Sequence, residues 1–327
     1  MNRNIFLAQK AILRGKMVLD DFFKKCYFYS FYFGFWSLVW WVGNYYGKLS
    51  SWKKTAEHKK KGWIWNYLEL YYINIIQHYK SYPEKSLPEE SDYRIWVFWA
   101  QGIDNMPALV RACYDNLLKR VQGEKVVLLT NENLGQYISL PISVRNCFEK
   151  GIIGYIHLSD IIRHSLLAKY GGLWIDATVW VTTNVPVSQL RSLPFYSAKD
   201  CTRQSHWASY LLGGCNVNAS LFCFVRDMMI AVCEREKYWP DYLFMDYLID
   251  YAFNHFPSVR ETMMSCPDNN LRRSDLWTRM NKVFDEEEYM RIIKDNWMFK
   301  LSYKSHLVPM VNGELTYYGA MINGKLQ

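Results

Sequence analysis

The chain has 327 residues, of which half are apolar and 17% are aromatic, enough to bury one large α/β domain with an appendage, or about two domains. Its net charge of +8 is concentrated near the N-terminus: residues 1–61 hold 12 basic and 3 acidic side chains, whereas the remainder holds 27 and 28. This composition excludes a largely disordered chain and a generally basic nucleic-acid-binding protein.

The first distinctive element is an aromatic segment over residues 26–47, with 12 aromatic residues among 22 and no charge. Its length suits a membrane span, but Tyr and Trp prefer the headgroup boundary, and both flanks are basic. We therefore expect a helix that lies in the interface of an anionic leaflet; a span or re-entrant hairpin and simple packing on the rest of the protein are the alternatives. The basic flanks are Arg14, Lys16, Lys24 and Lys25 before the segment and Lys48, Lys53, Lys54, Lys59, Lys60 and Lys61 after it.

Residues 63–82 are predicted to form a second aromatic-rich helix, which ends before a linker with two prolines and several acidic residues over 81–92. We therefore expect an N-terminal basic and aromatic membrane-association segment over 1–88, and a catalytic domain over 89–327. The eight cysteines show no CxxC spacing, and no secretory signal precedes them, so we expect reduced, mostly buried thiols.

After the linker, predicted strands alternate with predicted helices. The strands are expected over 94–100, 125–130 and 173–175, and the helices over 108–121, 159–170, 219–236, 241–255 and 285–295. Such alternation predicts an α/β fold with a mostly parallel, doubly wound sheet, in which ligands bind at the carboxyl ends of the strands.

The most informative segment for function reads HLSDIIRHSLLAKYGGLWIDATVWVT. Ser159 is a plausible helix N-cap, and Asp160 lies three residues before Arg163, so that the two side chains share a helix face. Two glycines at 171–172 are predicted to end the helix, and Asp176 follows a short buried strand. A carboxylate at that place suits binding of a metal, a ribose or a sugar hydroxyl. The alternative is that these residues only cap, pair and open a turn.

This segment resembles the SDxxRxxxLxxYGGxYxD region of glycosyltransferase family 32, most closely its bacterial capsular polysaccharide synthesis branch. Other segments agree in order, namely IWVFWAQGIDNMPALVRACYDN, SLFCFVRD, DYLFMDYLIDYAF, FKLSYK and LTYYG. The resemblance covers about residues 94–319 and does not extend to residues 1–90. It implies a Rossmann-like nucleotide-sugar-binding fold of the GT-A type and sugar transfer with retention of configuration.

The resemblance also implies roles for residues around the donor. Trp99 matches a tryptophan that stacks on uracil; the alternative is an ordinary core aromatic. Gln101 and Gly102 form the adjoining loop, where a glycine permits close backbone approach to the nucleotide. Asp160 and Arg163 match the pair that contacts the donor sugar.

Asp176 matches the first aspartate of the DxD motif, which contacts the donor and helps to organise a divalent metal, Mn²⁺ or Mg²⁺. Thr178 stands at the position of the second carboxylate, and because a hydroxyl is a weaker ligand, metal dependence is open. Lys304 and His306 match groups that contact the diphosphate. Asp246, on a helical pattern with Asp241 and Asp250, matches a family aspartate expected to support catalysis or acceptor binding.

We therefore expect a glycosyltransferase at the cytoplasmic face of a bacterial membrane. It would move a hexose, glucose or galactose, from a UDP-sugar to a lipid-linked (polyprenyl-diphosphate) saccharide during capsule or surface polysaccharide synthesis. An anionic membrane surface is an expected partner, and nucleic acid is not. The alternative, motivated by Thr178, is a non-catalytic scaffold that binds nucleotide-sugar or glycan in an assembly complex.

Overall fold

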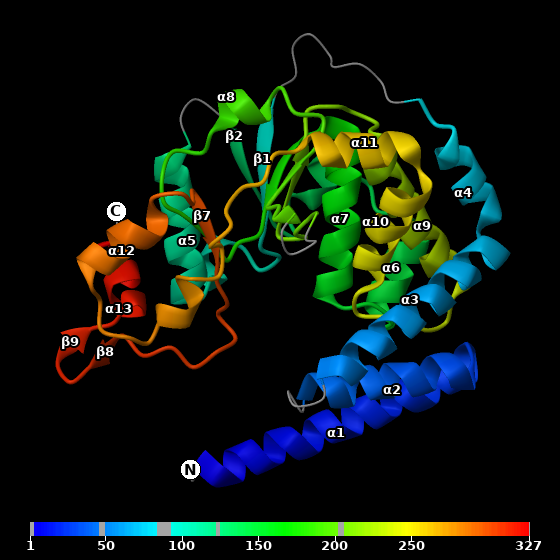
Figure 1. Cartoon of the computed structure of the whole chain (residues 1–327), viewed down its shortest axis with the longest axis horizontal. Coiled ribbons are helices and arrows are strands. Elements are labelled where there is room, and N and C mark those ends of the chain that lie inside the picture. The colour runs from blue at the N-terminus through cyan, green and yellow to red at the C-terminus, as the bar shows by residue number, and fades with distance from the viewer. Residues whose placement is uncertain (1–2, 46–49, 84–92, 122–124, 202–205, 327) are drawn as a thin grey trace. The chain divides into compact units, whose positions relative to one another are not determined.

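The computed structural model describes residues 3–45, 50–83, 93–121, 125–201 and 206–326 (Figure 1). These residues divide into two compact units. The helical unit comprises Met1–Ser81, Pro141–Leu158 and Asp227–Tyr251, and the sheet unit comprises Tyr82–Leu140, Ser159–Arg226 and Ala252–Gln327. The boundary expected between residues 88 and 89, with most of the expected linker, lies outside the described residues.

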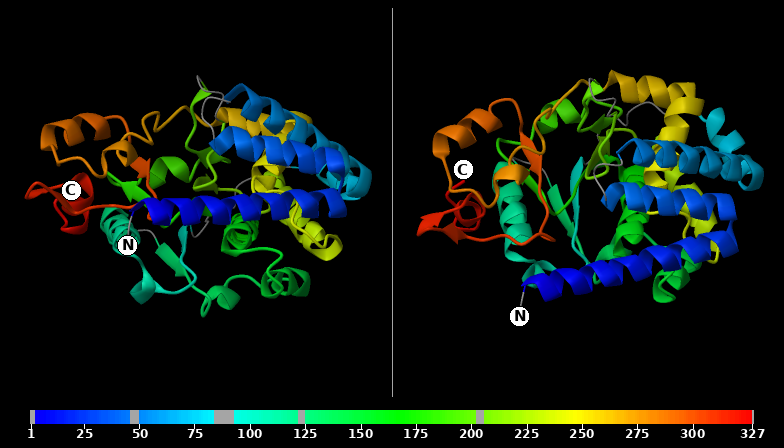
Figure 2. Two further views of the ribbon diagram at one scale, coloured as in Figure 1. Left: turned by 90° about the horizontal axis from the view of Figure 1, so that it is seen from below. Right: turned by 60° about the horizontal axis from the view of Figure 1, so that its bottom comes forward.

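The helical unit begins with helices that pack on one another in chain order (Figure 2). They are α1 (Arg3–Phe28), α2 (Phe31–Tyr45), α3 (Ser50–Tyr71) and α4 (Ile73–Lys80), and the unit also contains α6 (Ile142–Glu149). The residues expected to form one helix over 63–82 therefore lie mostly in two helices, the end of α3 and α4. Within the described residues, no helix is both long enough and apolar enough to cross a membrane.

The aromatic segment over 26–47 is not a single helix. The backbone N–H groups of Tyr29 and Ser30 both donate to Lys25 O, which ends α1. Ser30 Oγ then accepts from Phe33 N at 3.2 Å and caps the start of α2. A hydroxyl in the middle of the aromatic run thus supplies a local partner for the backbone, and the helix breaks there.

Two of the basic residues expected to flank a membrane segment are instead buried in the helical unit. Lys25 Nζ and Lys60 Nζ both contact Asp241 Oδ2, at 3.0 and 2.8 Å, and Lys25 also contacts Asp21 at 3.0 Å. Two ammonium groups and two carboxylates balance in charge, which is how such groups become tolerable away from water. Asp241 precedes α10 (Phe244–His255) rather than lying on it, so the expectation of one helical pattern from Asp241 was wrong.

The sheet unit is built on one mixed sheet with strand order β2-β1-β3-β6-β5 among the described residues. The strands are β1 (Arg94–Phe98), β2 (Lys125–Leu129), β3 (Gly172–Ile175), β5 (Tyr196–Ser197) and β6 (Leu211–Gly214). β1 runs parallel to β2 and β3, with Ile95 opposite Val126 and Leu173. β6 is antiparallel to both β3 and β5, so the sheet is parallel only on one side and not mostly parallel as expected.

Helix α7 (Tyr155–Tyr170) leads into β3 and supplies much of the site. It begins four residues earlier than expected, because Leu158 is buried and extends the apolar stripe back by one turn. Ser159 is therefore inside the helix, and the expectation that it caps the helix was wrong. The predicted helix end is confirmed: Gly171 and Gly172 have φ of +65° and +92°, and a Cβ at Gly172 would lie 2.3 Å from Arg94 O.

A second, two-stranded sheet pairs β4 (Val179–Val181) with β7 (Met298–Lys300), Val179 lying opposite Lys300. Its core is shared with α5 (Ala108–Arg120), α12 (Glu286–Ile293) and α13 (Tyr317–Ile322). This pairing brings the chain near residue 300 beside the end of β3. The remaining elements are η2 (Ile103–Asn105), η3 (Leu134–Gln136), α8 (Val187–Leu190), α9 (Ser220–Arg235), α11 (Pro257–Ser265), η5 (Trp277–Arg279), β8 (Met310–Val311) and β9 (Glu314–Leu315). All eight cysteines are free thiols and most are buried.

Candidate functional site

Polar side chains gather at one edge of the sheet, where β1 and β3 end. Because these strands are parallel, the residues after them, Trp99 and Asp176, lie at the same edge. Antiparallel β6 begins at this edge, and Asp176 N donates to Tyr210 O at 2.9 Å just before that strand. The strand ends therefore converge on one place within the sheet unit.

Asp176 is held from one side by a tryptophan and an arginine. Its Oδ1 accepts from Trp174 Nε1 at 2.8 Å and from Arg163 Nη2 at 3.2 Å. Arg163 Nη1 also donates to Asp160 Oδ1 at 3.1 Å, which confirms the shared helix face. The Asp160 and Arg163 side chains are only 11% and 4% exposed, while Asp176 is 26% exposed. One buried guanidinium thus links two carboxylates, and the second of these reaches solvent.

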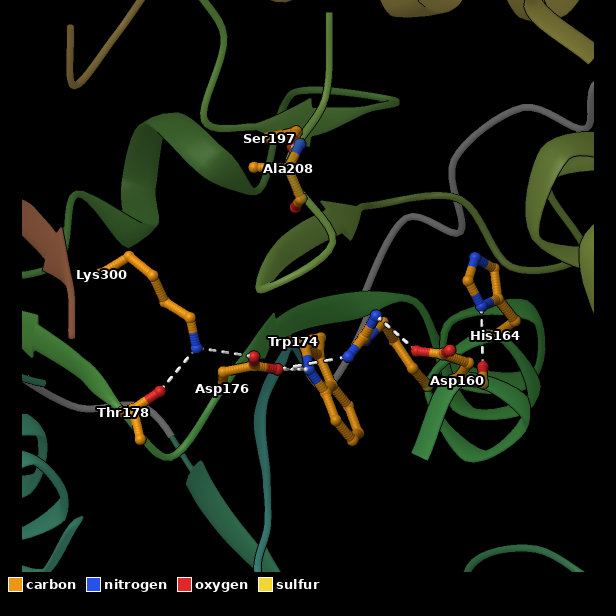
Figure 3. A network of polar contacts seen from close by, with 9 residues as sticks. Asp160, His164, Trp174, Asp176, Thr178, Ser197, Ala208 and Lys300 are labelled. Carbon is orange, nitrogen blue, oxygen red and sulfur yellow. Dashed lines mark hydrogen bonds and ion pairs between the residues drawn. The ribbon is translucent and has the colours of Figure 1, made fainter. Parts of the chain in front are cut away.

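On its other side, Asp176 is held by a lysine that the sequence did not single out. Lys300 Nζ lies 3.0 Å from Asp176 Oδ2 and 2.5 Å from Thr178 Oγ1. Figure 3 shows the ammonium between these two side chains, with Trp174 on the far side of the carboxylate. Asp176, Thr178 and Lys300 therefore form one contact group at the end of β3.

The charges around Asp176 keep it ionised. Burial would raise its pKa, but Lys300, Arg163 and the Trp174 N–H outweigh that effect and hold the pKa below its ordinary value. Burial and the neighbouring Arg163 lower the pKa of His164 to about 3 against the bond to Asp160. His164 is therefore a neutral imidazole that donates from Nδ1 to Asp160 O at 2.8 Å, and it fixes the turn of α7 that carries Asp160.

The loop before β6 is fastened by a buried serine. Ser197 Oγ donates to Leu211 O at 2.8 Å and accepts from Ala208 N at 2.7 Å, and Figure 3 shows Ser197 and Ala208 close together. This loop carries Tyr210, whose ring lies 5.4 Å from Lys300 Nζ. Burial raises the pKa of Tyr210 to about 12, so the phenol stays protonated at neutral pH.

Trp99 and the loop after it lie beside the segment that follows β7. The Trp99 ring meets the Tyr303 ring edge-on at 5.5 Å, and its Nε1 donates to Asn105 O at 3.3 Å. Gln101 is exposed, and Gly102 has φ of +81°, a conformation that glycine adopts without strain. Trp99 is partly buried, so part of its surface is open to solvent.

Three other expected site residues do not belong to the contact group of Asp176, Thr178 and Lys300. Lys304 and His306 are exposed on the loop after Tyr303, the residue that contacts Trp99. Among the described contacts, neither side chain touches Asp176, Thr178 or Lys300. Asp246 lies in the first turn of α10 and belongs to the helical unit. The structure thus unites Asp160, Arg163, Asp176 and Thr178, and it adds Lys300 and Trp174.

The oxygens at this site do not fit a resident divalent ion. Such an ion needs several oxygen ligands at about 2.0–2.6 Å, whereas both Asp176 oxygens and the Thr178 hydroxyl already face N–H donors. In the described part of the chain, no three His, Cys, Asp or Glu side chains converge to hold a metal.

Comparison with known proteins relates most of the chain to one family. A match to the capsular polysaccharide synthesis protein family covers residues 46–321. It begins well before residue 94, so the likeness extends further toward the N-terminus than the sequence motifs indicated. "O-glycosyltransferase braB" of Annulohypoxylon truncatum is 32% identical over 99 residues, 28% of this chain and 24% of the relative. The match thus spans about a quarter of the length of that curated relative.

Proposed function

Because the chain belongs to the capsular polysaccharide synthesis protein family, we propose that it transfers a hexose, glucose or galactose, from a UDP-sugar to a saccharide acceptor. The observation that carries this proposal is the buried Asp160–Arg163–Asp176 chain at the carboxyl edge of the sheet, where open α/β sheets bind their ligands. The local likeness to an O-glycosyltransferase supports the same class of reaction. The fold would then be of the GT-A type, and the acceptor a lipid-linked saccharide.

The proposed donor site uses the residues already brought together. Asp176 and Asp160 present carboxylate oxygens that accept hydrogen bonds from sugar and ribose hydroxyls, and Arg163 fixes both carboxylates. Trp99 offers a ring face for a base, which stacks without demanding a particular hydrogen-bond pattern. Departure of UDP develops negative charge on the diphosphate, so cations near it lower the barrier. Lys304 and His306 are proposed for this role from the loop beside Trp99.

The acceptor side is proposed to involve Asp246 and the membrane. Asp246 would bind the acceptor or support its attack, with the acceptor hydroxyl entering on the face from which UDP leaves, so that configuration is retained. A lipid-linked acceptor requires the protein to work at a membrane surface. The exposed apolar side chains of α1 and α2 support this placement: Leu13, Met17, Leu19, Phe23, Tyr27, Phe31, Tyr32 and Phe35. We propose that these helices bind the anionic cytoplasmic leaflet without crossing it.

A thermal-shift screen tests the donor assignment. The full-length protein is heated with UDP-glucose, UDP-galactose, UDP-N-acetylhexosamines or GDP-mannose, with and without Mn²⁺. A ligand present at one hundred times its Kd adds about 2.7 kcal/mol to the free energy of unfolding, which is a clear shift in Tm. Stabilisation by a UDP-hexose supports the proposal. The absence of stabilisation by any nucleotide-sugar would contradict the proposal. Stabilisation by a donor from which the protein never releases UDP would instead indicate a scaffold.

A further inference from the structure

We propose that the Lys300 ammonium takes the place of a divalent cation, so that this protein binds the diphosphate of its donor without a metal. The inference rests on the proposed nucleotide-sugar function and assigns a residue to it that no sequence motif singled out. It starts from the contact group of Asp176, Thr178 and Lys300, in which one ammonium faces both oxygen-bearing side chains.

Strand pairing fixes the position of Lys300. Thr178 directly precedes β4, and Lys300 is opposite Val179 in the antiparallel β4–β7 pair. Leu301 N also donates to Thr178 O at 2.9 Å, so backbone bonds fix the base of the lysine next to the threonine. The ammonium therefore sits between Asp176 Oδ2 and Thr178 Oγ1 because strand pairing puts it there, not through a chance contact of a surface side chain.

The charge of Lys300 matches the loss of the second carboxylate at Thr178. The charges of two carboxylates and one divalent ion sum to zero, and so do the charges of one carboxylate and one ammonium. The exchange of a second carboxylate for the neutral Thr178 hydroxyl is therefore matched by the exchange of a divalent ion for Lys300. A divalent ion added here would compete with Lys300 for the same oxygens.

Lys300 is also accessible to a ligand. The Lys300 and Asp176 side chains are 30% and 26% exposed, so a ligand can reach both. Asp176 and Thr178 accept two hydrogen bonds from an ammonium that can donate three. The Tyr210 ring lies 5.4 Å from Nζ, and a bound phosphate oxygen would accept the third hydrogen bond. Lysine is an effective point charge for phosphate. The negative charge that develops on a departing diphosphate would thus meet a cation that is already in place.

Metal dependence of UDP binding tests the inference on the unaltered full-length protein. The Kd of UDP is measured by calorimetry in excess EDTA and again with saturating Mn²⁺ or Mg²⁺. We expect the same Kd in all three conditions. A Kd that tightens by about tenfold or more with metal, equivalent to about 1.4 kcal/mol, would overturn the inference while leaving the proposed donor intact. Failure of UDP to bind in any condition would instead remove the proposed function, and the inference with it.

Substitutions then assign the effect to the lysine. Lys300→Met should weaken UDP binding about 10- to 100-fold, the range for a lost charge-assisted hydrogen bond, whereas Lys300→Arg should retain part of it. Lys294→Met removes an exposed lysine nearby in sequence and should change nothing. Combining Thr178→Asp with Lys300→Ala should create UDP binding that requires Mn²⁺. Melting curves confirm that each variant is folded, and wild-type affinity in Lys300→Met would overturn the proposal.

Discussion

At the scale of single residues, the site is defined by how completely Asp176 is surrounded by donors. Trp174 and Arg163 bond to one oxygen and Lys300 to the other. A carboxylate held in this way has a fixed orientation and a fixed charge before any ligand arrives. Such preorganisation is what makes a charged group effective in binding and catalysis, because no reorganisation is needed during the reaction.

Trp99 provides a prediction about the base of the donor. Trp99→Ala should weaken UDP binding about tenfold or more, because stacking on a base contributes about 1–3 kcal/mol, and Trp99→Phe should recover most of the affinity. Calorimetric titration with UDP measures both variants. Trp52→Ala, in a tryptophan that is 56% exposed on α3, is the matched control. Unchanged affinity in Trp99→Ala would remove this residue from the donor site.

The buried ion cluster of the helical unit provides a prediction about stability. Asp241→Asn leaves the buried ammonium groups of Lys25 and Lys60 without their shared carboxylate, which should lower the free energy of unfolding by about 3–5 kcal/mol. Urea denaturation measures this loss. Asp115→Asn, which breaks an exposed pair with Arg111, should cost about 1 kcal/mol or less. Equal costs for the two variants would show that the cluster is not a structural ion pair.

The same cluster predicts a dependence on pH. Burial would raise the pKa of Asp241, but Lys25 and Lys60 outweigh it and hold the pKa well below its ordinary value. A carboxyl with a lowered folded-state pKa stabilises the protein above its unfolded pKa of about 4 and loses that contribution as the pH falls further. Denaturation at a series of acidic pH values should therefore show wild type losing its advantage over Asp241→Asn below about pH 4. A constant difference would contradict this assignment.

Residues close in sequence were predictable, and distant ones were not. The spacing of Asp160 and Arg163 was enough to expect a shared helix face, and the family resemblance related Asp176 to the same donor. Lys300 is 124 residues from Asp176, and only the pairing of β4 with β7 brings it there. FKLSYK was part of the resemblance, yet its pattern directed attention to Lys304, because nothing local marks a lysine at the end of a short strand.

At the scale of elements, prediction succeeded where a strand or helix has local stop signals. β1, β2, β3 and α5 lie within a few residues of their expected positions, because glycines, prolines and polar loops bound them. The antiparallel placement of β6 could not be predicted, since it depends on which edge of the sheet is free. The aromatic segment misled for a different reason: its composition hid the break at Tyr29 and Ser30, where the backbone turns.

The exposed apolar face of α1 and α2 yields the next prediction. Phe23, Tyr27 and Phe31 are 64%, 83% and 69% exposed, and changing all three to Ser should weaken binding to anionic vesicles about tenfold or more, because each buried aromatic contributes about 1.5–3 kcal/mol. Co-sedimentation with vesicles of mixed anionic and neutral lipid measures the change. The matched control changes three other exposed apolar residues to Ser, namely Leu70, Ile142 and Met264.

Salt separates the two contributions to that binding. Lys25 and Lys60 are buried and Lys61 pairs with Asp250, so fewer cations face a membrane than composition suggested. Wild-type binding should thus weaken but persist at about 1 M salt, where exposed charges are screened. Alkaline carbonate should extract the protein. Resistance to carbonate extraction would contradict interfacial attachment. An equal loss of vesicle binding in the three-residue control variant would contradict the assignment of binding to the α1 and α2 surface.

At the scale of the whole molecule, the family match from residue 46 to residue 321 includes parts of both compact units. The sequences of α3 and α4 therefore fall within the match, whereas α1 and α2 both precede it. The donor is proposed to bind in the sheet unit, which alone contains the Asp160–Arg163–Asp176 chain and Lys300. The proposed membrane-binding helices α1 and α2 and the proposed acceptor residue Asp246 belong to the helical unit.

The most direct test of the account is release of UDP from a UDP-hexose by the full-length protein and by Asp176→Asn. Without an acceptor, an active transferase hydrolyses its donor slowly, and a coupled assay for free UDP follows the reaction. We expect measurable release by wild type and a loss of about 10²-fold or more in Asp176→Asn, while the Tm of the variant shows that it is folded. Release of UDP at the wild-type rate by the folded variant would contradict the assignment of this carboxylate, and with it the central claim.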